Sequence, residues 1–169
     1  MKNKEDLRID WVTLILRLVM GVGFIVHGWA KISRGTAGFG KLLAWIGVPF
    51  PQVSAVITSY TELIGGIALI LGLWTRYTVF PLAITMMVAL FTINVHYGFS
   101  SIKTIGLTPQ GPIFGPPGYE INLLYLAGLF ALLLLGSGKW SVDCLFFYKT
   151  GGNSGTSIPE PEKIISRRQ

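Results

Sequence analysis

The sequence predicts an all-α integral membrane protein, folded as a bundle of four transmembrane helices. Of its 169 residues, 51% are hydrophobic and only 13% are charged, about half the charged fraction of a typical soluble domain. The few charges collect at the ends: residues 1–10 hold 6 of the 22, residues 149–169 hold another 6, and the 138 residues between them hold 10. The middle of the chain is therefore suited to lipid.

The same composition argues against several other classes of protein. A single cysteine cannot form an internal disulfide, so a disulfide scaffold is excluded, and the apolar middle is unlike a disordered chain. The net charge of +6 forms no basic groove, so nucleic acid is not an expected partner. Aromatic residues lie near the ends of the apolar runs, as an interfacial belt requires: Trp11, Trp29, Trp74, Tyr77, Tyr97, Tyr119 and Trp140.

The first apolar run, Trp11 to Ala30, contains one charge, Arg17. A helix of this length rises ~30 Å and crosses the hydrocarbon core. A cleaved signal peptide is the alternative, but Trp29-Ala30-Lys31 stands where a small-x-small cleavage site would follow. We therefore interpret the run as a first transmembrane span.

Three further runs complete the predicted bundle. Val53 to Trp74 contains one charge, Glu62, and Tyr77 to Val95 contains none. The tight turn at Thr75-Arg76 predicts that these two spans form an antiparallel helical hairpin. The fourth run, Ile121 to Leu135, is the shortest, at ~23 Å of helix.

The expected organisation is a cytoplasmic N-terminal tail (1–10), a membrane domain (11–148) and a disordered cytoplasmic C-terminal tail (149–169). The tail contains the run Gly151-Gly152-Asn153-Ser154-Gly155, which is typical of disorder. Two loops are long, 31–52 and 96–120, and the second is rich in proline and glycine. That composition disfavours helix and strand, and it predicts an ordered cap or a mobile flap.

The distribution of basic residues predicts the orientation of the spans. With four spans both termini lie on one side of the membrane, and that side carries nine Lys and Arg residues against four on the other. The positive-inside rule then places both termini in the cytoplasm. The lone thiol of Cys144 lies on the reducing side, where it needs no special explanation.

Ionisable residues inside a span are costly and are candidates for function. Arg17, His27 and Lys31 share one face of the first predicted helix, and Glu62 shares a face with glycines of the second. Counting ~1.5 Å per residue from the ends of the spans, the Cα atoms of Arg17 and Glu62 differ in depth by only ~7 Å. An ion pair between them is therefore geometrically available, either to lock the two helices together or to form part of a site.

Other polar residues gather at the outer end of the predicted bundle. They are His27, Lys31, Asn94, His96 and Glu120. Taken singly, each is an ordinary helix end in water. Their convergence with the deeper Glu62 predicts a pocket with a polar mouth and apolar walls.

Few cofactor signals accompany these residues. Two histidines on different helices could ligate a haem, but a pair at helix ends without other signals does not favour one. No Cys/His cluster has zinc or iron–sulfur spacing, so no metal is expected. No nucleophile motif or P-loop is present, so no catalytic residue is predicted.

An ordered series of short motifs resembles the DoxX family. It runs from Arg17 through His27-Gly28-x-x-Lys31, Gly47-x-Pro49-x-Pro51, Glu62-x-x-Gly65-Gly66 and Gly72-x-x-Thr75-Arg76 to Gly136-x-Gly138-x-x-Ser141-x-Asp143. The resemblance implies a four-helix protein of the bacterial cytoplasmic membrane. The family includes proteins similar to the small membrane subunit of thiosulfate:quinone oxidoreductase, and others linked to quinone stress or to thiol redox complexes.

The leading hypothesis is an accessory subunit of a membrane redox system that binds a quinone or a similar lipid-soluble molecule in the outer half of the bundle. Without a redox cofactor of its own, such a subunit takes electrons from a partner redox protein. One alternative is a non-enzymatic membrane scaffold that anchors soluble redox enzymes. Another is a small transporter, for which four spans would need a homo-oligomer.

Overall fold

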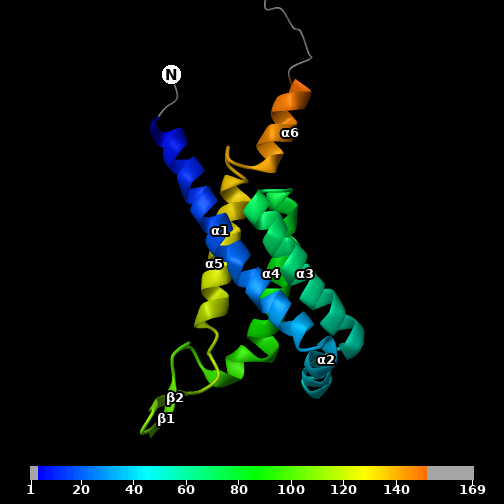
Figure 1. Ribbon diagram of the computed structural model, residues 1–169, viewed down its shortest axis with the longest axis vertical. Coiled ribbons are helices and arrows are strands. Elements are labelled where there is room, and N and C mark those ends of the chain that lie inside the picture. The colour runs from blue at the N-terminus through cyan, green and yellow to red at the C-terminus, as the bar shows by residue number, and fades with distance from the viewer. Residues whose placement is uncertain (1–3, 152–169) are drawn as a thin grey trace, which may run out of the picture.

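Four helices of a computed structural model, which describes residues 4–151, form an antiparallel bundle (Figure 1). These four are α1 (Lys4–Ser33), α3 (Pro51–Leu71), α4 (Thr75–Thr92) and α5 (Glu120–Leu135). The elements around them are α2 (Thr36–Trp45), the 3-10 helix η1 (Asn94–Tyr97), strands β1 (Thr104–Thr108) and β2 (Gly111–Phe114), and α6 (Val142–Gly151).

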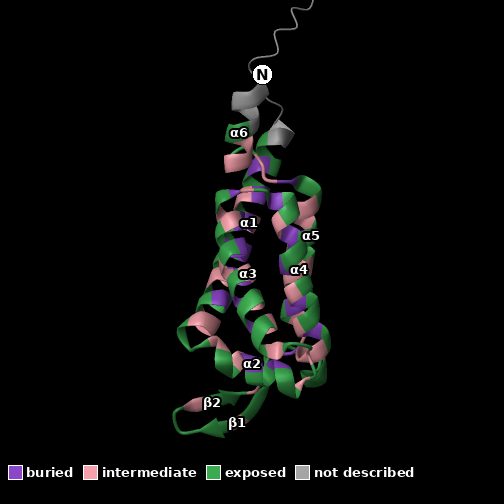
Figure 2. Cartoon of the chain, turned by 90° about the vertical axis from the view of Figure 1, so that its right-hand side faces the viewer, coloured by how far each residue is buried: buried purple, intermediate pink, exposed green. Residues whose placement is uncertain are grey.

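The arrangement confirms the predicted fold class. Three helices are long and apolar enough to cross a membrane, and α5 is a shorter apolar helix of 16 residues. The α1 helix packs mainly on α3, and α4 packs on α5. A thin buried core joins them (Figure 2), with Phe24, Leu69, Leu82, Leu129 and Leu132 almost fully buried. Many outward apolar side chains are exposed, as a lipid-facing surface requires.

Glycines allow α1 and α3 to approach closely. A Cβ atom on Gly28 would lie 2.6 Å from the backbone nitrogen of Leu63 and 2.8 Å from the carbonyl oxygen of Ser59. One on Gly66 would lie 2.7 Å from the carbonyl oxygen of Gly21. Small residues at such contacts drive helix association in membranes, where lipid replaces the usual hydrophobic driving force. These contacts also fix the relative register of the two helices.

Gly28→Ala is expected to destabilise the bundle. Because both atoms that the new methyl group meets are backbone atoms of α3, the helices must separate, at a cost of about 2 kcal/mol. The midpoint of thermal unfolding in detergent should fall by roughly 5 °C. Gly38→Ala is the control: a Cβ there meets no atom within 4 Å, and alanine within α2 should be neutral or slightly stabilising. Equal midpoints for the two variants would contradict the close-packing argument.

The loop between α4 and α5 corrects one expectation. We predicted that its prolines and glycines disfavour strand, but it contains an antiparallel hairpin in which Thr104 pairs with Phe114 and Thr108 pairs with Gly111. The prediction was wrong because a two-stranded sheet consists of edge strands, in which Pro112 is tolerated. The hairpin projects sideways from the end of the bundle that lies opposite the termini (Figure 1).

The helix boundaries also differ from the predicted divisions of the chain. The α1 helix already includes residues 4–10, which we expected to be a tail, and α6 extends past residue 148. From residue 152 onward, the predicted disordered tail lies outside the described residues. The first long loop contains α2, which packs against α3 at the end of the bundle away from the start of α1.

Candidate functional site

A cavity of about 750 Å³ opens in the half of the bundle that lies away from the termini. Its walls come from the second half of α1, from α2, from the first half of α3, from the second half of α4 and from the start of α5. Most of the lining is apolar and includes Phe39, Leu43, Ile57, Ile84 and Met86. Four of the predicted site residues line it as well: His27, Lys31, Glu62 and Asn94.

One polar group of the cavity is an ion pair. Nζ of Lys31 lies 2.5 Å from Oε2 of Glu62, and the two side chains are 23% and 3% exposed, respectively. The ammonium group also lies 4.7 Å from the centroid of the Phe39 ring, which adds a cation–π contact from α2. The carboxylate is therefore neutralised inside a largely apolar environment.

The predicted ion pair between Arg17 and Glu62 is wrong. Gly21 of α1 lies level with Gly66 of α3, and Gly28 lies level with Ser59. In this antiparallel register Arg17 is one turn beyond the first contact and Glu62 is between the two, so the residues are about two turns apart, roughly 11 Å along the axis. Lys31 lies less than one turn beyond Gly28, whose added Cβ would meet Leu63 as well as Ser59, and its long side chain reaches Glu62. Our depth estimate counted from assumed span ends, whereas the glycine contacts set the true alignment.

Arg17 lies toward the opposite end of the bundle and does not line the cavity. Its guanidinium donates hydrogen bonds to four carbonyl oxygens: Leu69 at 2.9 Å, Ile70 at 2.8 Å, Ser137 at 2.5 Å and Trp140 at 2.9 Å. The first two belong to the last turn of α3, where carbonyls lack partners within the helix. Arg17 therefore joins α1, the end of α3 and the turn after α5.

A pair of amides forms a second polar group in the cavity, and sequence reasoning found only half of it. Nδ2 of Asn94 donates to Oδ1 of Asn122 at 2.8 Å, and Nδ2 of Asn122 donates to the Met86 carbonyl at 3.4 Å. Asn122 is only 3% exposed. Its position within an apolar run was the signal that could have identified it. Tyr125, one turn further along α5, also lines the cavity.

The two remaining candidates lie outside the cavity lining. His96 is exposed in η1. Glu120 accepts a hydrogen bond from the backbone nitrogen of Ser101 at 3.0 Å, and Oγ of Ser101 accepts one from the nitrogen of Ile121 at 3.1 Å. Glu120 thus ties the loop to the start of α5. The structure brings only one of the two histidines, His27, to the cavity.

Comparisons with known proteins place these features in context. A family model described as DoxX matches residues 12–95. "Inner membrane protein YqjF" of Escherichia coli is 31% identical over 147 residues, which are 86% of the chain and 96% of that protein. "Putative oxidoreductase CatD" of Bacillus subtilis is 34% identical over 142 residues, 83% of the chain and 92% of that protein. An uncharacterized protein of Haemophilus influenzae is 32% identical over 151 residues, 88% of the chain and 100% of that protein. No solved structure matches the chain.

Proposed function

The chain belongs to the DoxX family of membrane proteins, and we propose that it is an accessory subunit of a membrane redox system, binding a quinone or a similar lipid-soluble carbonyl compound. One observation carries the proposal: the buried ion pair of Lys31 and Glu62 faces a cavity of about 750 Å³ whose walls are mostly apolar. Sites for small organic ligands combine such walls with a few converging polar groups.

The polar groups suit a ligand that bears carbonyl oxygens. A quinone head is flat and apolar and carries hydrogen-bond acceptors on opposite sides. The Lys31 ammonium has three N–H donors, of which the Glu62 carboxylate uses one. The amide pair of Asn94 and Asn122 lies on α5 and the segment after α4, so it can meet a second oxygen from another wall. A ligand without acceptors would leave the remaining N–H donors of Lys31 and of the amide pair unused.

In this proposal the protein's own residues bind the ligand and handle protons. Reduction of a quinone takes up two electrons and two protons, and a partner redox protein supplies the electrons. Lys31 and Glu62 lie beside the ligand and exchange protons with it, and His27, which lines the same cavity, is a further group for proton transfer. The relative named an oxidoreductase, CatD, favours this reading over an unrelated binding role. The excess of basic residues on the side of the termini supports a cytoplasmic location for both ends.

A cavity-filling variant tests the proposal directly. A short-tailed benzoquinone at about 100 times its Kd should raise the unfolding midpoint of the detergent-solubilised protein by roughly 5–10 °C. Ala89 lines the cavity, so Ala89→Phe should abolish this shift because the ring occupies the space of the ligand.

The matched control is Ala127→Phe, which adds the same side chain to an exposed position of α5 outside the cavity lining. It should retain the full shift. No shift in the unmodified protein, or an equal shift in the two variants, would rule out quinone binding in this cavity.

A further inference from the structure

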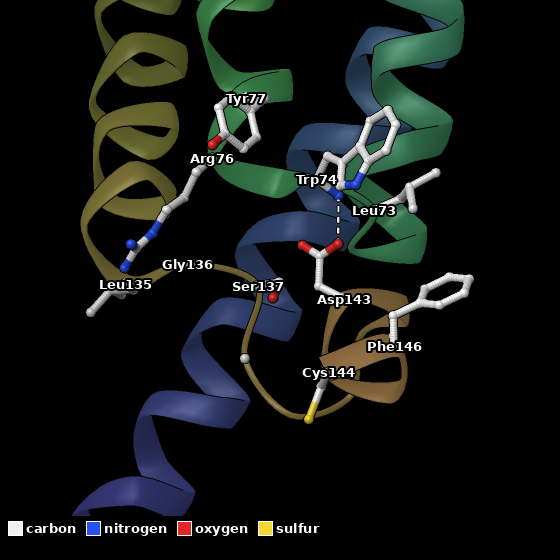
Figure 3. A pocket seen from close by; sticks show the side chains of 11 residues that line it. Leu73, Trp74, Arg76, Tyr77, Leu135, Gly136, Ser137, Asp143, Cys144 and Phe146 are labelled. Carbon is white, nitrogen blue, oxygen red and sulfur yellow. Dashed lines mark hydrogen bonds between the residues drawn. The ribbon is translucent and has the colours of Figure 1, made fainter. Parts of the chain in front are cut away.

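A second cavity, of about 820 Å³, lies at the other end of the bundle, beside the start of α6 (Figure 3). The turn between α3 and α4, the end of α5 and the start of α6 form it. Its walls are largely apolar, with Leu73, Tyr77, Leu135 and Phe146 among the lining residues. It is distant from the ion pair of Lys31 and Glu62, so the proposed quinone site does not explain it.

The cavity contains a cation without a partner. Arg76 makes no hydrogen bond or ion pair with any residue that the structure describes, and its side chain extends toward Leu135 and Gly136 (Figure 3). A Cβ atom on Gly136 would lie 3.5 Å from Nε of Arg76, so the guanidinium passes within van der Waals distance of the turn after α5. Arg76 is exposed and available to a ligand.

The one carboxylate in the lining is already engaged. Asp143 accepts hydrogen bonds from the backbone nitrogens of Trp74 at 2.7 Å and Thr75 at 3.2 Å, and so caps the start of α4. Arg17 lies behind the wall, where it donates to the carbonyl of the lining residue Ser137 but pairs with no carboxylate among the described residues. The cavity and the wall behind it thus hold two arginines and one carboxylate, and the start of α4 adds the positive end of a helix dipole.

The surroundings show that the cavity opens at the membrane surface. Trp74 and Tyr77, which line it, are 70% and 76% exposed and lie at a helix end. Exposed aromatic residues at helix ends mark the level of the lipid headgroups. An anionic lipid headgroup at this level brings an acyl chain with it, and the apolar walls suit that chain better than water.

We propose that this cavity binds an anionic phospholipid, with the phosphodiester on Arg76 and an acyl chain along the wall of Tyr77 and Leu135. A phosphate carries the oxygen geometry that a guanidinium binds best. The excess of positive charge favours a headgroup such as phosphatidylglycerol over a zwitterionic one, whose own cation would face Arg76. The apolar walls favour a lipid over free phosphate.

Lipid binding to the full chain in detergent, measured by native mass spectrometry, tests this assignment. Phosphatidylglycerol should bind more tightly than phosphatidylcholine with the same acyl chains, and inorganic phosphate should not compete. Arg76→Gln should weaken phosphatidylglycerol binding roughly fivefold. The matched control is Lys139→Gln, which removes an exposed cation at the same end but outside the lining, and it should leave the affinity unchanged.

A second variant keeps the proposal testable if Arg76→Gln does not fold. Leu135→Glu keeps Arg76 but offers it a carboxylate, so it should also weaken phosphatidylglycerol binding while the quinone response of the other cavity persists. Unchanged affinity in Arg76→Gln, equal binding of the two lipids, or competition by inorganic phosphate at lipid-like concentrations would each overturn the proposal.

Discussion

Arg17→Met is expected to lower the free energy of unfolding by about 4 kcal/mol or more, because it leaves buried carbonyl groups without a hydrogen-bond donor. Arg17 is 2% exposed and donates to four carbonyl oxygens, two at the end of α3 and two in the turn after α5. Methionine has a similar length but no donor, so α3 loses a C-terminal cap and the turn after α5 loses its attachment. The midpoint of thermal unfolding in detergent should fall by roughly 10–15 °C.

The control for this prediction is the same substitution at an exposed arginine. Arg34 lies exposed just after α1, and Arg34→Met should change stability by no more than about 0.5 kcal/mol. Arg17→Lys separates charge from geometry, because a lysine keeps the charge but has only three donors on one atom. It should recover part of the stability but not all. A midpoint for Arg17→Met that matches Arg34→Met would refute the structural role.

The architecture could be predicted because apolar runs report helices that cross a membrane almost independently of their neighbours. The runs at 53–74 and 77–95 correspond to α3 and α4 with their tight turn. The loops were less predictable. Whether residues 104–114 form a hairpin depends on pairing between two short strands. Composition alone predicted neither of these strands. The helix α2 within the first loop likewise depends on packing against α3.

Sequence reasoning named part of the cavity lining but not the pairing within it. The cavity lies in the half of the bundle away from the start of α1, and its lining includes His27, Lys31, Glu62 and Asn94. The partner of Glu62 could not be read from depth counts, since an error of one helical turn exchanges Arg17 for Lys31. The register depends on which glycines meet across α1 and α3, which is a property of the packed pair of helices.

Lys31→Met is expected to destabilise the protein by about 3 kcal/mol, because it leaves the Glu62 carboxylate buried without a counter-charge. That carboxylate is 3% exposed, and Lys31 is its only ion-pair partner among the described residues. Glu62→Gln should cost less. The Lys31 side chain is 23% exposed and near the end of α1, so its ammonium can extend toward the membrane surface. The unfolding midpoints of the two variants in detergent measure this asymmetry.

The double variant Lys31→Met/Glu62→Gln gives the sharper result. If the pair is stabilising mainly because each charge compensates the other, removing both should cost less than Lys31→Met alone, since no charge remains buried. The second substitution would then raise the midpoint of a protein that the first had weakened, an interaction energy of about 1–3 kcal/mol in the double-mutant cycle. Additive losses would instead mean that Lys31 and Glu62 contribute separately, Lys31 through the Phe39 ring and Glu62 through contacts with α1. The cycle therefore decides whether Lys31 and Glu62 act as a coupled ion pair. The proposed binding and proton exchange at one site require that coupling.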